Sequence, residues 1–247
     1  MSIERKSTER LITWRNLPVS DGVPMDNDNH TTQAEMYLRQ PLRRFLAEQG
    51  LKAFIGVNSF VYYQTRPAKA KGPDFYVVNG GEWTMQGSWV IPAENGLKPT
   101  LIVELLSPST EVTDRTTKKD FYETIFQTPD YGIYDTENQR FEAWHRIDGV
   151  YRPVAALASG RIPCQSLPLH LGVHGRWLRW FLPDGTMLPT DEELRKQAEE
   201  LKKQAVEQTK QERERRVRMA RRLLQSGMSL EEVVEMAELA PEDLTGS

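Results

Sequence analysis

The chain has 247 residues, 38% of them apolar and 27% charged, with a net charge of −3. This length suits one domain with an appendage or two small domains, and no apolar run reaches the roughly 18 residues of a membrane span. The single cysteine, Cys164, excludes an intramolecular disulfide framework and a cysteine-based zinc site. Because the N-terminal sequence has no apolar signal core, we expect a cytoplasmic location. The near-neutral charge at first argues against a nucleic-acid partner.

Residues 1–190 predict a mixed α/β domain. Apolar side chains at helical spacing predict a helix over residues 31–48, which Pro41 is able to kink. A second helix is expected at 114–127. Strands are expected at 54–63, 74–78, 88–91, 101–106, 131–135, 140–146 and 150–157. This order of elements favours a central mixed sheet flanked by helices.

The C-terminal quarter differs in composition. Residues 191–226 lack Gly and Pro and are rich in helix formers, which predicts one long helix. Its apolar stripe breaks between residues 206 and 216, so a weak coiled coil and a solvated helix are both open interpretations. Ser229, with Glu232 three residues on, predicts a capping box and a short amphipathic helix. We therefore expect three parts, at residues 1–188, 189–226 and 227–247.

The strand at 101–106, LIVELL, carries the sharpest chemical signal. Side chains alternate along a strand, so both of its faces are apolar, as expected of a central strand covered on both sides. Glu104 then lies on the same face as Ile102 and Leu106. Burying an unpaired charge is costly, so this carboxylate must meet a cation, a base or a cleft. Two interpretations of Glu104 are given equal weight: an ion pair with a residue of a helix, and a place in a functional site.

Two further segments carry chemically useful side chains. Asp74, in Lys71-Gly72-Pro73-Asp74, opens the strand at 74–78, although a Pro-Asp pair alone is usually turn chemistry. On the second helix, Asp114, Lys118 and Tyr122 follow at four-residue steps along one side. The simple alternative is an exposed Asp114–Lys118 pair, worth about 0.3–0.5 kcal/mol. Lys119 competes with Lys118, because it also aligns with Tyr122.

Two carboxylates from neighbouring strands and one lysine together predict phosphodiester chemistry. Hard oxygen ligands suit Mg²⁺ or Mn²⁺, with waters and a phosphate completing the coordination. Such a metal generates a hydroxide nucleophile and neutralises the leaving oxygen, while a nearby ammonium stabilises charge on the scissile phosphate.

The segments PDFYVV, LIVELLSPST and DRTTKKDFY resemble the Uma-type family of restriction endonucleases, whose members look like PD-(D/E)XK nucleases. The resemblance covers roughly residues 15–175 and implies a restriction-endonuclease-like fold, here followed by the long C-terminal helix. It implies that Asp74 and Glu104 bind the metal, that the carbonyl of Leu105 completes the ligand set, and that Lys118 acts near the phosphate. The lysine usual two residues after the Glu is absent, since Leu106 stands there.

The resemblance also implies supporting residues. Ser107, Asp114 and Tyr122 match positions of the family motifs. His30 matches a histidine at the start of the first helix, and Glu35 resembles an acid that some nucleases add from a helix. One departure lies after the second helix, where Asp130 stands in place of the family's glutamate.

These arguments favour a magnesium-dependent DNA endonuclease that works as a homodimer, because a double-strand cut needs two sites. The net charge loses force against DNA, since ligand carboxylates are offset once a divalent cation binds. One alternative is an inactive nuclease-like module that binds partners through its C-terminal helix. Another is a nucleic-acid binder that does not cut, which would show salt-dependent affinity without product.

Overall fold

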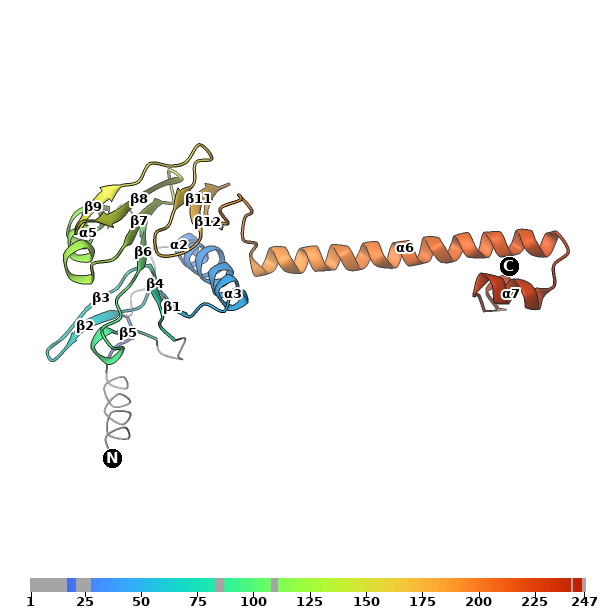
Figure 1. The fold of residues 1–247 in the computed structure, drawn as a ribbon, viewed down its shortest axis with the longest axis horizontal. Coiled ribbons are helices and arrows are strands. Elements are labelled where there is room, and N and C mark those ends of the chain that lie inside the picture. Colours follow the sequence, from blue (N-terminus) through green and yellow to red (C-terminus); the bar gives the residue numbers. More distant parts are fainter. Residues whose placement is uncertain (1–16, 21–27, 83–86, 108–110, 241, 246–247) are drawn as a thin grey trace, which may run out of the picture. The chain divides into compact units, whose positions relative to one another are not determined.

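The computed structural model describes residues 17–20, 28–82, 87–107, 111–240 and 242–245 (Figure 1). The chain divides into two compact units, Met1–Asp191 and Glu192–Ser247. Within the described residues, no helix combines the length and the apolar character needed to cross a membrane.

A six-stranded sheet lies at the centre of the first unit, in the order β1-β4-β6-β7-β8-β9. The strands are β1 (Ala53–Val57), β4 (Phe75–Asn79), β6 (Leu101–Leu106), β7 (Asp130–Asp135), β8 (Arg140–Ile147) and β9 (Val150–Pro153). β6 and β7 run parallel, and all other neighbours run antiparallel. The predicted central mixed sheet is therefore confirmed. Tyr76 pairs with Ile102, and continuing this register by two residues brings Asp74 opposite Glu104.

Two smaller sheets accompany the central one. They contain β2 (Val61–Thr65), β3 (Ala68–Lys71) and β5 (Trp89–Val90) in one, and β10 (Ile162–Pro163), β11 (His170–His174) and β12 (Trp177–Phe181) in the other. The expected single strand at 54–63 is wrong. Asn58 has a φ of 41°, a left-handed conformation that asparagine tolerates better than most residues. It turns the chain between β1 and β2, which join different sheets. A 3-10 turn, η2 (Ile91–Ala93), follows β5.

One helical segment covers the first face of the central sheet. It consists of α2 (Asp28–Thr32), the π-helical turns η1 (Gln33–Arg39) and α3 (Gln40–Glu48). Pro41 lies in the first turn of α3, directly after the π-helical turns of η1, and the helical segment continues through it. Buried side chains of this segment, among them Leu38 and Leu42, form one core cluster with alternate residues of β6. Those residues are Leu101, Val103 and Leu105.

A second helical segment covers the other face. It consists of α4 (Glu111–Thr113), η3 (Asp114–Lys118), α5 (Lys119–Phe121) and η4 (Tyr122–Phe126), with π-helical turns in η3 and η4. Tyr122 and Phe126 belong to the core cluster that contains Ile102 and Leu106 of β6. The central strand is thus covered on both faces, as its alternation predicts, and Glu104 faces the second segment.

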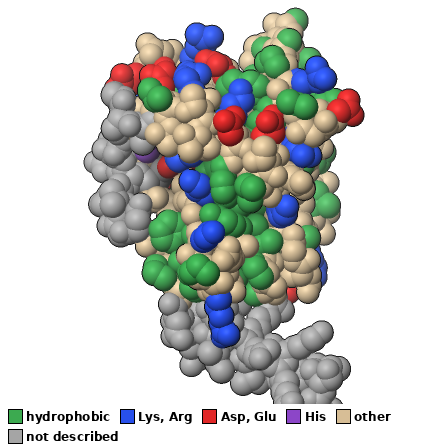
Figure 2. Space-filling model, turned by 90° about the vertical axis from the view of Figure 1, so that its left-hand side faces the viewer, with side chains coloured by type: hydrophobic (Ala, Val, Ile, Leu, Met, Phe, Trp, Pro, Cys, Tyr) green, Lys and Arg blue, Asp and Glu red, His purple; other side chains and the backbone are tan. Residues whose placement is uncertain are grey.

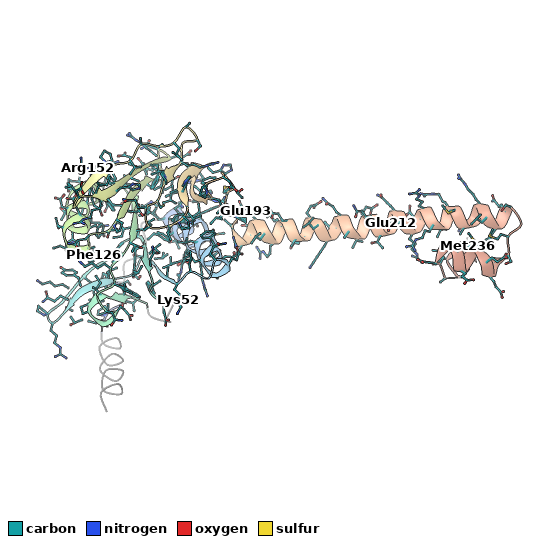
Figure 3. All side chains as sticks on the ribbon, in the orientation of Figure 1. Lys52, Phe126, Arg152, Glu193, Glu212 and Met236 are labelled. Atoms are coloured by element: carbon teal, nitrogen blue, oxygen red, sulfur yellow. The ribbon has the colours of Figure 1, made fainter. Side chains whose placement is uncertain are left out.

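In the second unit, α6 spans Asp191–Gln225, as the composition predicts, and is followed by α7 (Leu230–Ala237) and α8 (Glu242–Thr245). Ser229 and Glu232 form the predicted capping box at the start of α7. Ala220, Val233 and Leu239 form a small core that closes α7 against the end of α6. From residue 195 to residue 215 every side chain of α6 is exposed, and these side chains project all around the helix (Figure 3). The coiled coil stays a prediction.

Candidate active site

Asp74 and Glu104 lie together where β4 begins and β6 approaches its end. The backbone N–H of Asp74 donates to Oε2 of Glu104 at 3.3 Å, and the backbone N–H of Leu105 donates to Oδ2 of Asp74 at 2.7 Å. The side chain of Glu104 is fully buried. The structure therefore brings together the two acids that the sequence places on separate strands. The Leu105 N–H, which no sequence pattern marks as a donor, bonds to Asp74 and holds it beside β6.

Lys118 reaches this pair from the second helical segment. Its Nζ lies 3.0 Å from Oε2 of Glu104 and 2.7 Å from Oδ1 of Asp114. The Asp114 side chain is fully buried and that of Lys118 is 19% exposed. The exposed-pair alternative for Asp114 and Lys118 is therefore wrong. The Nζ of Lys119 lies 3.9 Å from the ring centroid of Trp144 instead.

Two buried tyrosines donate hydrogen bonds to Glu104 and to the backbone of Asp114. The hydroxyl of Tyr122 donates to Oε1 of Glu104 at 2.7 Å, and the hydroxyl of Tyr131 donates to the backbone carbonyl of Asp114 at 2.8 Å. Burial and then the charge of Glu104 raise the pKa of Tyr122 well above its usual range, so it stays a donor. No motif in the sequence points to Tyr131. Its only signal is its place in β7, beside Ile102 of β6.

The charges of the site depend on one another. Burial raises the pKa of Asp74 well above its usual range, and the negative charge of Glu104 adds to this, whereas Lys118 and the Leu105 N–H oppose it. Burial by itself lowers the pKa of Lys118, but the charges of Glu104, Asp74 and Asp114 outweigh burial and raise that pKa above its usual value. Lys118 is therefore held as a cation between carboxylates.

The donor set suits a small divalent cation that keeps most of its waters. Among the described residues there is no group of three or more His, Cys, Asp and Glu side chains that could enclose a metal. Mg²⁺, however, is usually bound through one or two carboxylates with water and phosphate completing its shell. Asp74 and Glu104 supply two carboxylates. The N–H and C=O of a strand residue point to the same side, so the Leu105 carbonyl points to the side of the Asp74 carboxylate.

Ser107 links β6 to the second helical segment. It is buried, and its backbone carbonyl accepts a hydrogen bond from the N–H of Glu111 at 3.1 Å, where that segment begins. Ser107 thus helps to fix the start of the helix that carries Lys118. The rest of the Ser-Pro-Ser-Thr motif, residues 108–110, lies outside the described residues.

His30 and Glu35 come from the helical segment on the opposite face of the sheet from Glu104. His30 is buried, and its Nε2 lies 3.1 Å from the hydroxyl of Thr136. Glu35 forms an ion pair with Arg39 one turn later, at 2.8 Å. The structure therefore gives both residues local partners away from the two acids, whereas Tyr122 donates to Glu104 and Asp114 pairs with Lys118.

Asp130, which departs from the family motif, is the first residue of β7, whereas Glu104 lies beside Ile133 further along that strand. It is buried and accepts hydrogen bonds from the backbone N–H groups of Gln165 and Ser166. The Nε2 of His145 lies 3.3 Å from its carboxylate. Asp130 fastens the loop before β11 to the sheet, and β7 pairs it with Leu101, three residues before Glu104.

Comparison with known proteins identifies the family. The Uma2 family, described as "Putative restriction endonuclease", matches residues 21–179, a stretch that includes Asp74, Glu104 and Lys118. The chain belongs to this family. The resemblance inferred from the motifs is thereby confirmed, and Uma2 is described as a family of nucleases.

No curated protein matches the chain. Among solved structures, the chain is similar to one titled a putative nuclease belonging to DUF820 from Anabaena variabilis ATCC 29413. The two chains share 14% identity with a TM-score of 0.40, over 59% of this chain and 87% of that chain.

Proposed function

We propose that this Uma2 protein hydrolyses phosphodiester bonds with a divalent metal and acts as a DNA endonuclease. The observation that carries the proposal is the meeting of Asp74 and Glu104 from neighbouring strands, with the Nζ of Lys118 3.0 Å from Glu104. Membership of a family described as restriction endonucleases supports the same chemistry.

Asp74, Glu104 and the Leu105 carbonyl are the groups that would hold Mg²⁺ or Mn²⁺. Their two carboxylates lie close together and largely out of water, so they repel each other, and a divalent cation offsets that repulsion. When bound, the metal supplies the Lewis-acid chemistry that activates water and neutralises the leaving oxygen.

The other residues of the site either stabilise charge on the phosphate or position a neighbouring side chain. Lys118 presents an ammonium group beside Glu104, where it stabilises negative charge that develops on the scissile phosphate. Asp114 is a positioning residue that fixes the Lys118 amine through their ion pair at 2.7 Å. Tyr122 is a positioning residue for Glu104, because its hydroxyl occupies Oε1 and leaves the other oxygen facing Lys118 and Asp74.

The decisive experiment measures Mg²⁺-dependent cleavage of DNA by the full chain and its variants. Asp74→Ala and Glu104→Gln are expected to abolish cleavage while the circular dichroism spectrum stays native. Lys118→Met is expected to slow cleavage by about 100-fold or more, the usual loss when one charge-stabilising donor is removed. Lys119→Met is the matched control and is expected to cleave like the wild type. Full activity in Glu104→Gln would reject the assignment.

The non-cutting alternatives give different results. The exposed stretch of α6 between residues 195 and 215 favours an interaction module, and such a module binds no Mn²⁺ through Asp74. Calorimetric titration of the wild type and Asp74→Ala with Mn²⁺ therefore separates it from the nuclease. A binder that does not cut shows salt-dependent affinity for DNA and no product. A double-strand cut needs two sites, so we also propose a homodimer, which sedimentation equilibrium tests.

A further inference from the structure

The hairpin of β2 and β3 precedes Asp74 directly and is strongly basic. Between Glu48 and Asp74 the chain contains no Asp or Glu. The hairpin and its turn carry Arg66 and Lys69, both exposed, and Lys71, which is half-buried. β3 is an edge strand of its three-stranded sheet. A two-stranded ribbon of positive charge therefore ends three residues before a candidate metal ligand.

Two ring contacts fasten this hairpin to the helical segment that carries Lys118. The ring of Tyr63 in β2 meets that of Phe121 edge-on, with centroids 5.1 Å apart. The Nζ of Lys71 lies 5.0 Å from the centroid of the same Phe121 ring. From Lys71 to Asp74 the chain spans at most about 10 Å, even when fully extended. The basic ribbon is therefore held beside the candidate active site.

The two lysines share one face of the hairpin. Side chains alternate along a strand, so Lys69 and Lys71 point to the same side of β3. Their cross-strand partners, Gln64 and Val61, carry no charge, so neither lysine is neutralised within the ribbon. In Figure 1 the hairpin lies at the left of the first unit, the side that faces the viewer in Figure 2. There Lys and Arg side chains are scattered from the top to the lower part, and most Asp and Glu lie in the upper part.

We propose that the β2–β3 hairpin is a ribbon that binds duplex DNA next to the phosphate that is cut, with Arg66, Lys69 and Lys71 on backbone phosphates. This inference rests on the proposed function. The major groove of B-form DNA admits a two-stranded ribbon, whereas the deep, narrow major groove of A-form RNA does not. Phosphate contacts of this kind fix the position of the protein along the duplex and carry no sequence information.

Basic edge strands have another common explanation. Lysines on an edge strand block unwanted pairing with a second sheet edge. That explanation covers Lys69 and Lys71 but gives no reason for Arg66 in the turn, or for the anchoring of the ribbon beside Asp74 and Lys118. The two explanations differ in one measurable quantity, the salt dependence of binding to DNA.

The experiment measures binding of a fluorescent, mixed-sequence DNA duplex by anisotropy in EDTA, so that binding is separated from cleavage. The full chain is compared with the triple variant Arg66→Gln, Lys69→Gln, Lys71→Gln. Each neutralised phosphate contributes about 0.9 to the slope of log affinity against log salt, so the slope is expected to fall by about 2.7. The control variant Arg195→Gln, Lys202→Gln, Lys203→Gln removes the same charges from exposed positions of α6 and is expected to keep the wild-type slope.

The outcomes separate this inference from the proposed function. A reduced slope in the hairpin variant alone, restored in Lys69→Arg, Lys71→Arg with Arg66 intact, supports the ribbon. An unchanged slope overturns the ribbon, and cleavage by the wild type in Mg²⁺ would then leave the nuclease standing. Tighter binding to single-stranded DNA or to an RNA duplex overturns the choice of partner. Hairpin-dependent binding with no cleavage in Mg²⁺ supports the ribbon and rejects the nuclease.

Discussion

Two helices of this protein carry an acid four residues before a lysine, and the two pairs have opposite environments. Asp114 and Lys118 approach to 2.7 Å, with side chains that are 0% and 19% exposed. Glu192 and Lys196 of α6 approach to 2.6 Å, with side chains that are 44% and 73% exposed. The spacing and the distance are alike, so the pairs differ in burial and in the second carboxylate, that of Glu104, which Lys118 also contacts.

Burial changes what each pair does. An exposed pair competes with water and with the conformational freedom of two long side chains, so it adds little stability. A buried pair costs desolvation when it forms and a great deal when it is broken, because one partner is left as an uncompensated charge. The exposed pair of Glu192 and Lys196 therefore adds little to α6. The buried pair of Asp114 and Lys118 fixes the Lys118 amine beside Glu104.

The largest expected effect follows from removing Asp114. Asp114→Ala leaves the buried Lys118 with one fewer counter-charge and is expected to lower the free energy of unfolding by about 3 kcal/mol or more. Urea denaturation followed by tryptophan fluorescence measures this in the first unit, because all six tryptophans precede residue 191. Asp120→Ala, at an exposed position of the same helical segment, is the control and is expected to change little. Equal effects of the two variants would contradict the distinction by burial.

Local sequence patterns predict some parts of this fold and not others. Alternation in LIVELL predicts a strand covered on both faces, and the absence of Gly and Pro predicts α6, because both features are properties of adjacent residues. The division of residues 54–63 between two sheets was not predicted. Apolar residues lie on both sides of the Asn58-Ser59 pair, and the pattern does not reveal that Asn58 has a φ of 41° and turns the chain there.

The candidate site was predictable in its residue types and not in its burial. Spacing places Asp114, Lys118 and Tyr122 on one side of a helix, yet it gives the same pattern for a solvated face. Only the sheet register brings Asp74 opposite Glu104, and only the packing of the helix on that face buries Asp114. Tyr131 escaped notice for the same reason, since its contact with Asp114 depends on two elements packed together.

An intermediate effect is expected at Tyr122. Tyr122→Phe keeps the ring in its core cluster but removes the hydroxyl that donates to Oε1 of the buried Glu104, which costs about 1.5–3 kcal/mol for a hydrogen bond to a charged group. The control is Tyr134→Phe, because the Tyr134 hydroxyl donates to a neutral backbone carbonyl at 2.8 Å, and its loss is expected to cost about 1 kcal/mol. Urea denaturation measures both. A larger loss at Tyr134 would contradict the view that Glu104 is held as a buried charge.

The smallest effect is expected at Lys196. Lys196→Gln removes the ion pair with Glu192, and because both side chains are open to water, thermal denaturation followed by circular dichroism is expected to be unchanged. Glu192→Gln tests the other partner in the same way. A clear loss of stability in both variants, growing with protein concentration, would mean that a second copy covers α6. The coiled-coil interpretation of α6 would then be correct. The Glu192–Lys196 pair would be buried in the dimer, as the Asp114–Lys118 pair is buried in the first unit.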